Sequence, residues 1–268
     1  MRPALAALIA LAPFLTSLPA TAQPSKSVFL EDLTWTEVRE ATKAGRTTII
    51  VPIGGTEQSG PHIALGKHNV RARLLAGRIA EALGNALVAP VIAYVPEGPA
   101  SPPTGHMRFP GTITIPEGVF EQTLESAGRG FRIHGFKDVV FIGDHGGYQK
   151  SMKKAADTLN REWASTSIRA HALDAYYKAA SVEFDETLKA KGYTQAEIGN
   201  HAGAADTSLA LATDPALVRA DRMKAPNMGK ADGVEGDPRR ASAELGRAGL
   251  DLIVARSVEA IRKATARR

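Results

Sequence analysis

The chain contains no cysteine, and only 6% of its 268 residues are aromatic. Disulfide bonds and thiolate metal centres are therefore excluded, so stability must come from an apolar core, with metal binding or oligomerisation as further sources. The net charge is only +5, and the Lys and Arg residues are spread along the chain instead of forming a basic block. A chain of this composition is not expected to bind nucleic acid.

Long apolar runs are also missing, except at the N-terminus. Arg2 precedes an apolar run over residues 4–18, and the small residues Ala20-Thr21-Ala22 follow it. This order predicts a signal peptide over residues 1–22, with Gln23 as the first residue of the mature chain. The run is short and interrupted by proline, which disfavours the alternative of an uncleaved membrane anchor. We therefore expect a periplasmic or secreted protein that has no membrane attachment after cleavage.

Residues 23–268 alternate between strand-like and helix-like segments. This alternation predicts a single α/β domain in which helices cover both faces of a mostly parallel sheet. Asn69 is predicted to cap one of the helices. The predicted strands are 47–53, 86–95, 112–115, 138–142 and 168–173, and the predicted helices are 35–44, 69–83, 116–134, 149–163, 176–190, 209–212 and 241–266.

Two of the predicted strands are followed by glycines and histidines. The first glycine-rich turn delivers Glu57, His62 and His68 within twelve residues, and the second carries Asp144 and His145. Carboxylate and imidazole are zinc-type ligands, and sites in parallel sheets lie at the carboxyl ends of strands. The pattern indicates a metal site if the two strands are neighbours. The alternative is that these histidines are structural residues with satisfied hydrogen bonds.

Five segments, in order along the chain, resemble the creatininase (creatinine amidohydrolase) family. The resemblance implies a three-layer α/β/α sandwich with a mostly parallel central sheet, commonly assembled as a hexamer. It also implies a two-metal site that hydrolyses amide C–N bonds of small-molecule substrates. The segments are Glu57-Gln58-Ser59-Gly60-Pro61-His62, Phe109-Pro110-Gly111-Thr112-Ile113, Gly143-Asp144-His145-Gly146-Gly147, His201-Ala202-Gly203 with Asp206-Thr207-Ser208, and Gly233-Val234-Glu235-Gly236-Asp237-Pro238.

The resemblance places one set of metal ligands at Glu57, His68 and His145. The chain departs from the family at the second ion. His68 stands where the family has a bridging aspartate, and Ser59 stands where it has a histidine. Glutamates of the family are replaced by small residues, Gly147 and Ala204. These losses predict a mononuclear site with one divalent ion, for which zinc is favoured over manganese or iron.

His201 and Asp206 match family residues near the substrate. The resemblance implies that His201 shuttles a proton to the leaving nitrogen, and that Asp206 orients His201 or a water molecule. A structural histidine and a helix cap are the respective alternatives.

Three further residues, Ser59, His62 and His106, are expected to contact the substrate. His62 could instead be a ligand, whereas a nucleophilic role for Ser59 is disfavoured because no Gly-x-Ser-x-Gly turn surrounds it. Asp144 is interpreted either as a partner of His145 or as a surface turn residue. Lys67 is interpreted as a solvated loop charge.

The sequence thus predicts a metal-dependent hydrolase that opens a small amide, lactam or related C–N bond with a metal-activated water. One alternative is lactone opening or other metal-dependent chemistry at the same site. The other is a ligand-binding protein that has kept the fold without catalysis.

Overall fold

The computed structural model describes residues 27–226 and 228–266. The predicted signal peptide over residues 1–22 and its cleavage point before Gln23 lie outside these residues. Within the described ranges, no helix combines the length and the apolar character that crossing a bilayer would require.

Four parallel strands form the central sheet in the order β2-β1-β3-β4. They are β1 (Thr48–Ile53), β2 (Ala86–Val88), β3 (Asp138–Gly143) and β4 (Arg169–Ala172). The central pair is in register along its whole length, with Thr48 opposite Asp138 and Ile53 opposite Gly143. The carboxyl ends of β1 and β3 therefore finish side by side, as the sequence prediction of a shared site required.

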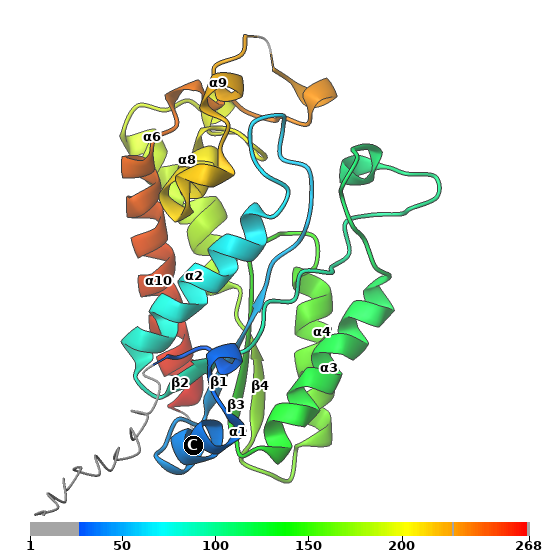
Figure 1. Cartoon of the computed structure of the whole chain (residues 1–268), viewed down its shortest axis with the longest axis vertical. Helices are drawn as coiled ribbons and strands as arrows, with labels where there is room; N and C mark the ends of the chain where they lie inside the picture. Colours follow the sequence, from blue (N-terminus) through cyan, green and yellow to red (C-terminus); the bar gives the residue numbers. More distant parts are fainter. Residues whose placement is uncertain (1–26, 227, 267–268) are drawn as a thin grey trace, which may run out of the picture.

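Side chains alternate between the two faces of the sheet, and both faces are apolar. Ile49, Val51 and Phe141 pack with α1 (Trp35–Lys43), α3 (Glu117–Ile133) and α4 (Gln149–Glu162). Ile50 and Ile142 face α2 (Lys67–Leu83) and α10 (Ala243–Thr265) on the other side. Figure 1 shows the resulting three layers, with cyan α2 and red α10 on one side and green α3 and α4 on the other. The predicted three-layer α/β/α sandwich is confirmed.

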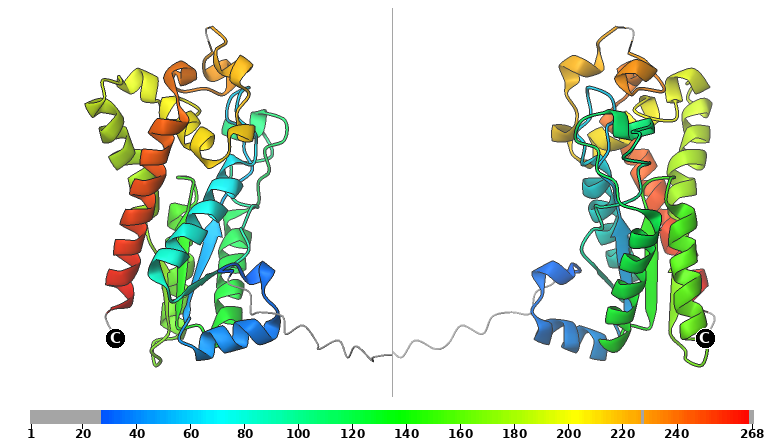
Figure 2. Two further views of the ribbon diagram at one scale, coloured as in Figure 1. Left: turned by 60° about the vertical axis from the view of Figure 1, so that its left-hand side comes forward. Right: turned by 90° about the vertical axis from the view of Figure 1, so that its right-hand side faces the viewer.

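Apart from η1 (Leu30–Asp32), which lies near α1 (Figure 1), the remaining elements gather beyond the carboxyl ends of the strands (Figure 2). Gly246 brings α10 close to α8, since a Cβ atom there would lie 1.8 Å from the Ser208 carbonyl oxygen. The short elements are α5 (Ala175–Lys178), the π-helical turn η3 (Ala179–Glu183), α6 (Phe184–Ala190), α7 (Gln195–Ile198), α8 (Ala204–Thr213), α9 (Ala220–Met223), and the 3-10 turns η1 (Leu30–Asp32), η2 (Gly105–Arg108), η4 (Pro215–Leu217), η5 (Lys230–Asp232) and η6 (Pro238–Arg240).

Three local predictions were wrong. Strand β2 ends at Val88, before Pro90, which cannot donate to the ladder, and the segment 112–115 is not a strand. Asn69 lies inside α2 and does not cap it. Its side chain accepts a hydrogen bond from the Gly55 amide at 3.0 Å and donates one to Thr56 Oγ1 at 3.1 Å. Asn69 therefore fastens the loop that carries the first predicted metal ligand.

Candidate active site

A cavity of about 540 Å³ opens at the carboxyl ends of β1 and β3. Its volume is typical of small-molecule sites, which occupy roughly 300–1,000 Å³. The loops after β1 and β3, the first turn of α2, η2 and the start of α8 all contribute side chains to its wall. Segments far apart in sequence therefore meet at the edge of the sheet where the sequence predicted a site.

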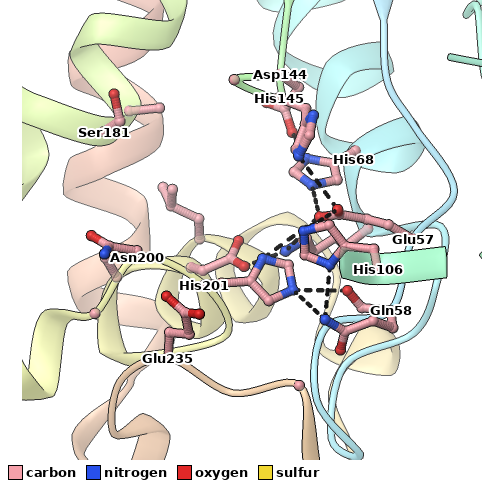
Figure 3. A pocket seen from close by; sticks show the side chains of 18 of the residues that line it. Glu57, Gln58, His68, His106, Asp144, His145, Ser181, Asn200, His201 and Glu235 are labelled. Atoms are coloured by element: carbon pink, nitrogen blue, oxygen red, sulfur yellow. Dashed lines mark hydrogen bonds and ion pairs between the residues drawn. The ribbon is translucent and has the colours of Figure 1, made fainter. Parts of the chain in front are cut away.

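Glu57 lies at the centre of this cavity, surrounded by four histidine rings (Figure 3). Glu57 Oε2 lies 3.4 Å from His145 Nε2 and 3.4 Å from His106 Nε2. Glu57 Oε1 lies 2.8 Å from His68 Nε2 and 3.7 Å from His201 Nδ1. The fold thus brings together the three predicted ligands, the predicted proton shuttle and one of the predicted substrate contacts.

His68 is held between two carboxylates. Its Nδ1 lies 2.6 Å from Asp144 Oδ2, and its Nε2 faces Glu57. Burial and the charge of Lys67 oppose protonation of this ring, but the contacts with Asp144 and Glu57 outweigh them and raise the pKa of His68 above its ordinary value. Burial would raise the pKa of Glu57, yet the hydrogen bond and charge of His68, together with the charge of Lys67, hold it well below the usual range. The two carboxylates therefore favour the protonated form of His68.

Lys67 and Arg71 supply further buried cations from the first turns of α2. Lys67 is only 1% exposed, and its Nζ pairs with Asp206 while lying 3.7 Å from Glu57 Oε1. Arg71 pairs with Asp144 at 2.8 Å and with Asp206 at 3.2 Å. Burial alone would raise the pKa of Asp206, but Lys67 and Arg71 hold it well below the ordinary value. The interpretation of Lys67 as a solvated loop charge was wrong, because the start of α2 turns its side chain into the cavity wall.

Asp144 is neither a surface turn residue nor a direct partner of the His145 ring. It is buried, and besides His68 and Arg71 it accepts a hydrogen bond from the Tyr176 hydroxyl at 2.5 Å. Its role in the structure is to neutralise the cations on α2.

His145 is placed by Tyr148, whose buried hydroxyl joins the ends of β1 and β3. The hydroxyl accepts from the amides of Asp144 and His145 at 2.9 and 3.0 Å, and it lies 2.8 Å from the carbonyl oxygens of Ile53 and Gly54. Burial lowers the pKa of His145 to about 4. The ring is therefore neutral at pH 7, which is the form that binds metal ions.

His201 lies at the opposite side of Glu57. Its Nε2 lies 2.8 Å from the carbonyl oxygen of Gln58, so that nitrogen carries the ring proton and Nδ1 presents its lone pair toward Glu57. Burial, followed by the charge of Lys67, lowers the pKa of His201 to about 4. The next residue, Ala202, has a φ of 54°, a left-handed conformation that is costly for a residue with a Cβ. This turn therefore presents a neutral imidazole with a free nitrogen toward Glu57 and the cavity.

Ser59 and His62, which were expected to contact substrate, do not line the cavity. Both are fully buried behind its wall. Burial lowers the pKa of His62, whose Nε2 lies 3.0 Å from Thr207 Oγ1 on α8. The third expected contact, His106, does line the cavity, and Gln58 Nε2 lies 2.9 Å from its Nδ1.

Sequence reasoning missed Glu97. Its side chain is fully buried at the back of the site, with Oε2 3.8 Å from His145 Nε2. Burial, and then the charge of Glu57, raise the pKa of Glu97 to about 9. One signal could have revealed it, since Glu97 is the only carboxylate between Glu81 and Glu117 and follows a strand-like segment next to β1.

The donor groups fit a divalent metal ion. Two sets of three ligand atoms lie within 4.8 Å of one another, namely Glu57 with His106 and His201, and Glu57 with Glu97 and His145. In the second set, Glu57 Oε2 and both Glu97 oxygens are buried without a hydrogen-bond partner. Buried carboxylates are normally paired or bind metal, so these orphaned oxygens are the evidence that a cation belongs here.

Comparison with known proteins shows which family the chain belongs to. The family profile described as creatininase, creatinine amidohydrolase, matches residues 31–261. The chain belongs to the creatininase family.

It is 29% identical to the creatinine amidohydrolase of Pseudomonas putida over 209 residues, which cover 74% of this chain and 76% of that protein. It is 30% identical to the mycofactocin precursor peptide peptidase of Mycobacterium tuberculosis over 226 residues, covering 75% and 78% of the two chains.

Solved creatininases share the fold. A crystal structure of creatinine amidohydrolase superposes with a TM-score of 0.75 at 26% identity, over 90% of this chain and 99% of that one. Similar solved creatininases include a manganese form and a Zn–Zn form. The chain is therefore a creatininase-like amidohydrolase from a metal-dependent family.

Proposed function

We propose that this protein uses one divalent metal ion, with zinc favoured, to hydrolyse a small amide, lactam or related C–N bond. The observation that supports it most is the buried Glu57 carboxylate at the base of a small-molecule cavity, among the histidines and the orphaned carboxylate oxygens described above. Glu57 and His145 would hold the ion, with His68 or Glu97 as a third ligand. When bound, such an ion polarises a carbonyl group and lowers the pKa of a bound water.

The charge on the other side of Glu57 supports one ion over two. Lys67 Nζ already lies 3.7 Å from Glu57 Oε1 and pairs with Asp206. An ammonium group there supplies positive charge and repels a second cation from that oxygen. Lys67 thus supports the mononuclear site that the substitutions at Ser59, Gly147 and Ala204 predicted.

The remaining steps fall to side chains of this chain. His201 is neutral, and its Nδ1 lone pair faces the cavity, so it can take a proton from the attacking water and pass it to the leaving nitrogen. Asp206 is held by Lys67 and Arg71 and accepts a hydrogen bond from the Ala202 amide at 3.2 Å, which fixes the turn that carries His201. Asp206 would therefore orient His201 through the backbone.

The substrate class follows from the relatives and the cavity. One solved creatininase variant is complexed with creatine, a small molecule. The 540 Å³ cavity of this chain could enclose a molecule of that kind or a somewhat larger one. Exposed polar side chains at its rim, Arg108, Asn200, Lys230 and Glu235, would contact polar groups of the substrate.

Metal content and turnover together test this function. The mature protein should contain one zinc or manganese ion per subunit by elemental analysis. It should open the ring of at least one member of a panel of lactams, cyclic ureides and creatinine, so that the product carries a carboxylate and a freed amine, urea or guanidine group, respectively. His145→Ala should lose both properties. Two ions bound with equal affinity would refute the mononuclear site, and a wild-type protein that binds no ion would refute the whole proposal.

We further propose that residues 1–22 are removed on export and that residues 23–268 act as one domain in the periplasm or outside the cell. The mature protein would form a homo-oligomer, which is a hexamer if it follows its family. Trp35 and Ile133, 73% and 78% exposed, are apolar surface that an interface could cover. Light scattering of the purified protein would show a monomer if the oligomer proposal is wrong.

A further inference from the structure

Glu97 is a buried carboxylate for which the protein itself offers no partner. Its side chain is fully buried, and neither oxygen has a hydrogen-bond partner. Across residues 27–226 and 228–266, no Lys or Arg forms an ion pair with it; the neutral His145 ring places Nε2 3.8 Å from its Oε2, and the negatively charged Glu57 lies beside it. A buried carboxyl group without a hydrogen-bond partner is costly whether it is charged or protonated, and a bound cation would supply the missing partner.

The protein is shaped to hold this carboxylate in place. A Cβ atom on Gly55 would lie 2.9 Å from Glu97 Oε1, so the absence of a side chain at this glycine makes room for the carboxylate. The Glu97 amide donates to Thr114 Oγ1 at 3.0 Å, and Thr114 Oγ1 donates in turn to the Gly98 carbonyl at 2.9 Å. Thr114 therefore holds the backbone of Glu97 in place.

The groups that face Glu97 are metal-ligand atoms. Glu57 Oε2 is likewise buried without a hydrogen-bond partner, and His145 Nε2 lies 3.4 Å from it. The three side chains can each place one ligand atom within 4.8 Å of the other two. Two carboxyl groups and one imidazole therefore converge at one point, and two of the three residues, Glu57 and His145, also line the cavity.

His68, in contrast, has no nitrogen free for an ion. Its Nδ1 is bonded to Asp144 and its Nε2 to the other oxygen of Glu57. Arg71 Nη2 also lies 3.2 Å from Nδ1. These contacts leave Glu57 Oε2 as the oxygen that points toward Glu97.

We propose that Glu97 is the third ligand of the metal ion, together with Glu57 and His145, and that His68 is a positioning residue that orients Glu57. This inference rests on the proposed metal-dependent function and specifies its ligand set. One imidazole and two carboxylates suit zinc and manganese. Binding through His145 Nε2 requires the ring proton on Nδ1, so the contact from the Gly147 amide to Nδ1, now 3.1 Å, must loosen on loading.

Metal affinity and stability of three glutamine variants test the proposal. Glu97→Gln removes the ligand charge at nearly constant shape, and His68→Gln removes the positioning ring. Glu121→Gln is the matched control, because Glu121 is a buried glutamate on α3 that pairs with Lys154 and does not line the cavity. Each mature protein is stripped of metal, titrated with Zn²⁺ and with Mn²⁺ against a chromogenic chelator, and melted with and without Zn²⁺.

Glu97→Gln should lower Zn²⁺ affinity by more than about 100-fold, beyond the 10–100-fold loss typical of residues that only support a ligand. His68→Gln should fall within that smaller range, and the control should match the wild type. Without metal, Glu97→Gln should melt close to the wild-type temperature, because Glu97, whose pKa is raised to about 9, is already uncharged at pH 7, yet the variant should lose the Zn²⁺-induced rise in Tm.

Two results would overturn the assignment. If Glu97→Gln binds Zn²⁺ within about threefold of the wild type while His68→Gln loses it, His68 is the ligand and the proposed metal-dependent function still stands. If the wild type binds neither Zn²⁺ nor Mn²⁺, both the ligand set and the proposed function are wrong. The two failures are thus distinguished by the wild-type titration alone.

Discussion

Tyr148→Phe should weaken both the fold and the metal site, because one buried hydroxyl joins the strand ends that carry them. Without the hydroxyl, the His145 amide loses its hydrogen-bond partner and the Gly54 carbonyl loses its donor. The Asp144 amide retains a bond to the Ile53 carbonyl oxygen at 3.1 Å, so it is not orphaned.

The cost follows from these lost bonds. One unsatisfied buried amide costs about 1–3 kcal/mol, and one lost net hydrogen bond adds roughly 0.5–1.5 kcal/mol. We therefore expect a loss of about 2–4 kcal/mol in the free energy of unfolding. For a chain of about this size, that corresponds to a fall in Tm of roughly 5–15 °C.

Urea unfolding of the metal-free protein measures this loss directly. Tyr193→Phe is the control, since its exposed hydroxyl donates only to the Arg240 carbonyl at 3.0 Å and should contribute less than about 0.5 kcal/mol. Because Tyr148 also fixes the backbone of His145, its variant should lower Zn²⁺ affinity by about 10–100-fold. A Tyr148→Phe protein as stable as the Tyr193→Phe protein would show that the hydroxyl does not join the strands energetically.

Three further predictions concern buried charges and export. Lys67→Met should destabilise the protein by about 1–3 kcal/mol in urea unfolding, because Asp206 loses one of its two cations and keeps only Arg71; an unchanged midpoint would contradict this. Burial raises the pKa of Asp185 to about 6, so the folded state keeps a proton that the unfolded chain loses from about pH 4 upward, and stability falls as pH rises through that window. Asp185→Asn should accordingly raise Tm at pH 7 but not at pH 4, and equal shifts at both pH values would exclude the burial effect. N-terminal sequencing of protein from the producing cell should begin at Gln23, whereas soluble protein that retains Met1 would refute export.

The sequence determined the layers and the edge at which the site lies. Apolar runs such as 138–142 could only be buried strands, and the amphipathic segments between them required helices on both faces. Parallel strands place their carboxyl ends together, so the sequence predicted that Glu57 and His145 meet if their strands are neighbours, as β1 and β3 are. The family motifs added the identity of the fold, because their residues recur in one order over most of the chain.

The sequence did not determine which polar groups around Glu57 are paired and which are left over. Lys67 looked like a loop charge because only the tertiary structure turns the first residue of α2 into the wall beside Asp206. His68 matched a ligand position, yet packing places a carboxylate against each of its nitrogens. Glu97 lies in no recognisable sequence motif. It stands out only because neither of its buried oxygens has a hydrogen-bond partner. Hydrogen-bond satisfaction is a property of three-dimensional neighbours, and it is therefore the tertiary structure that decided which side chains are free to hold an ion.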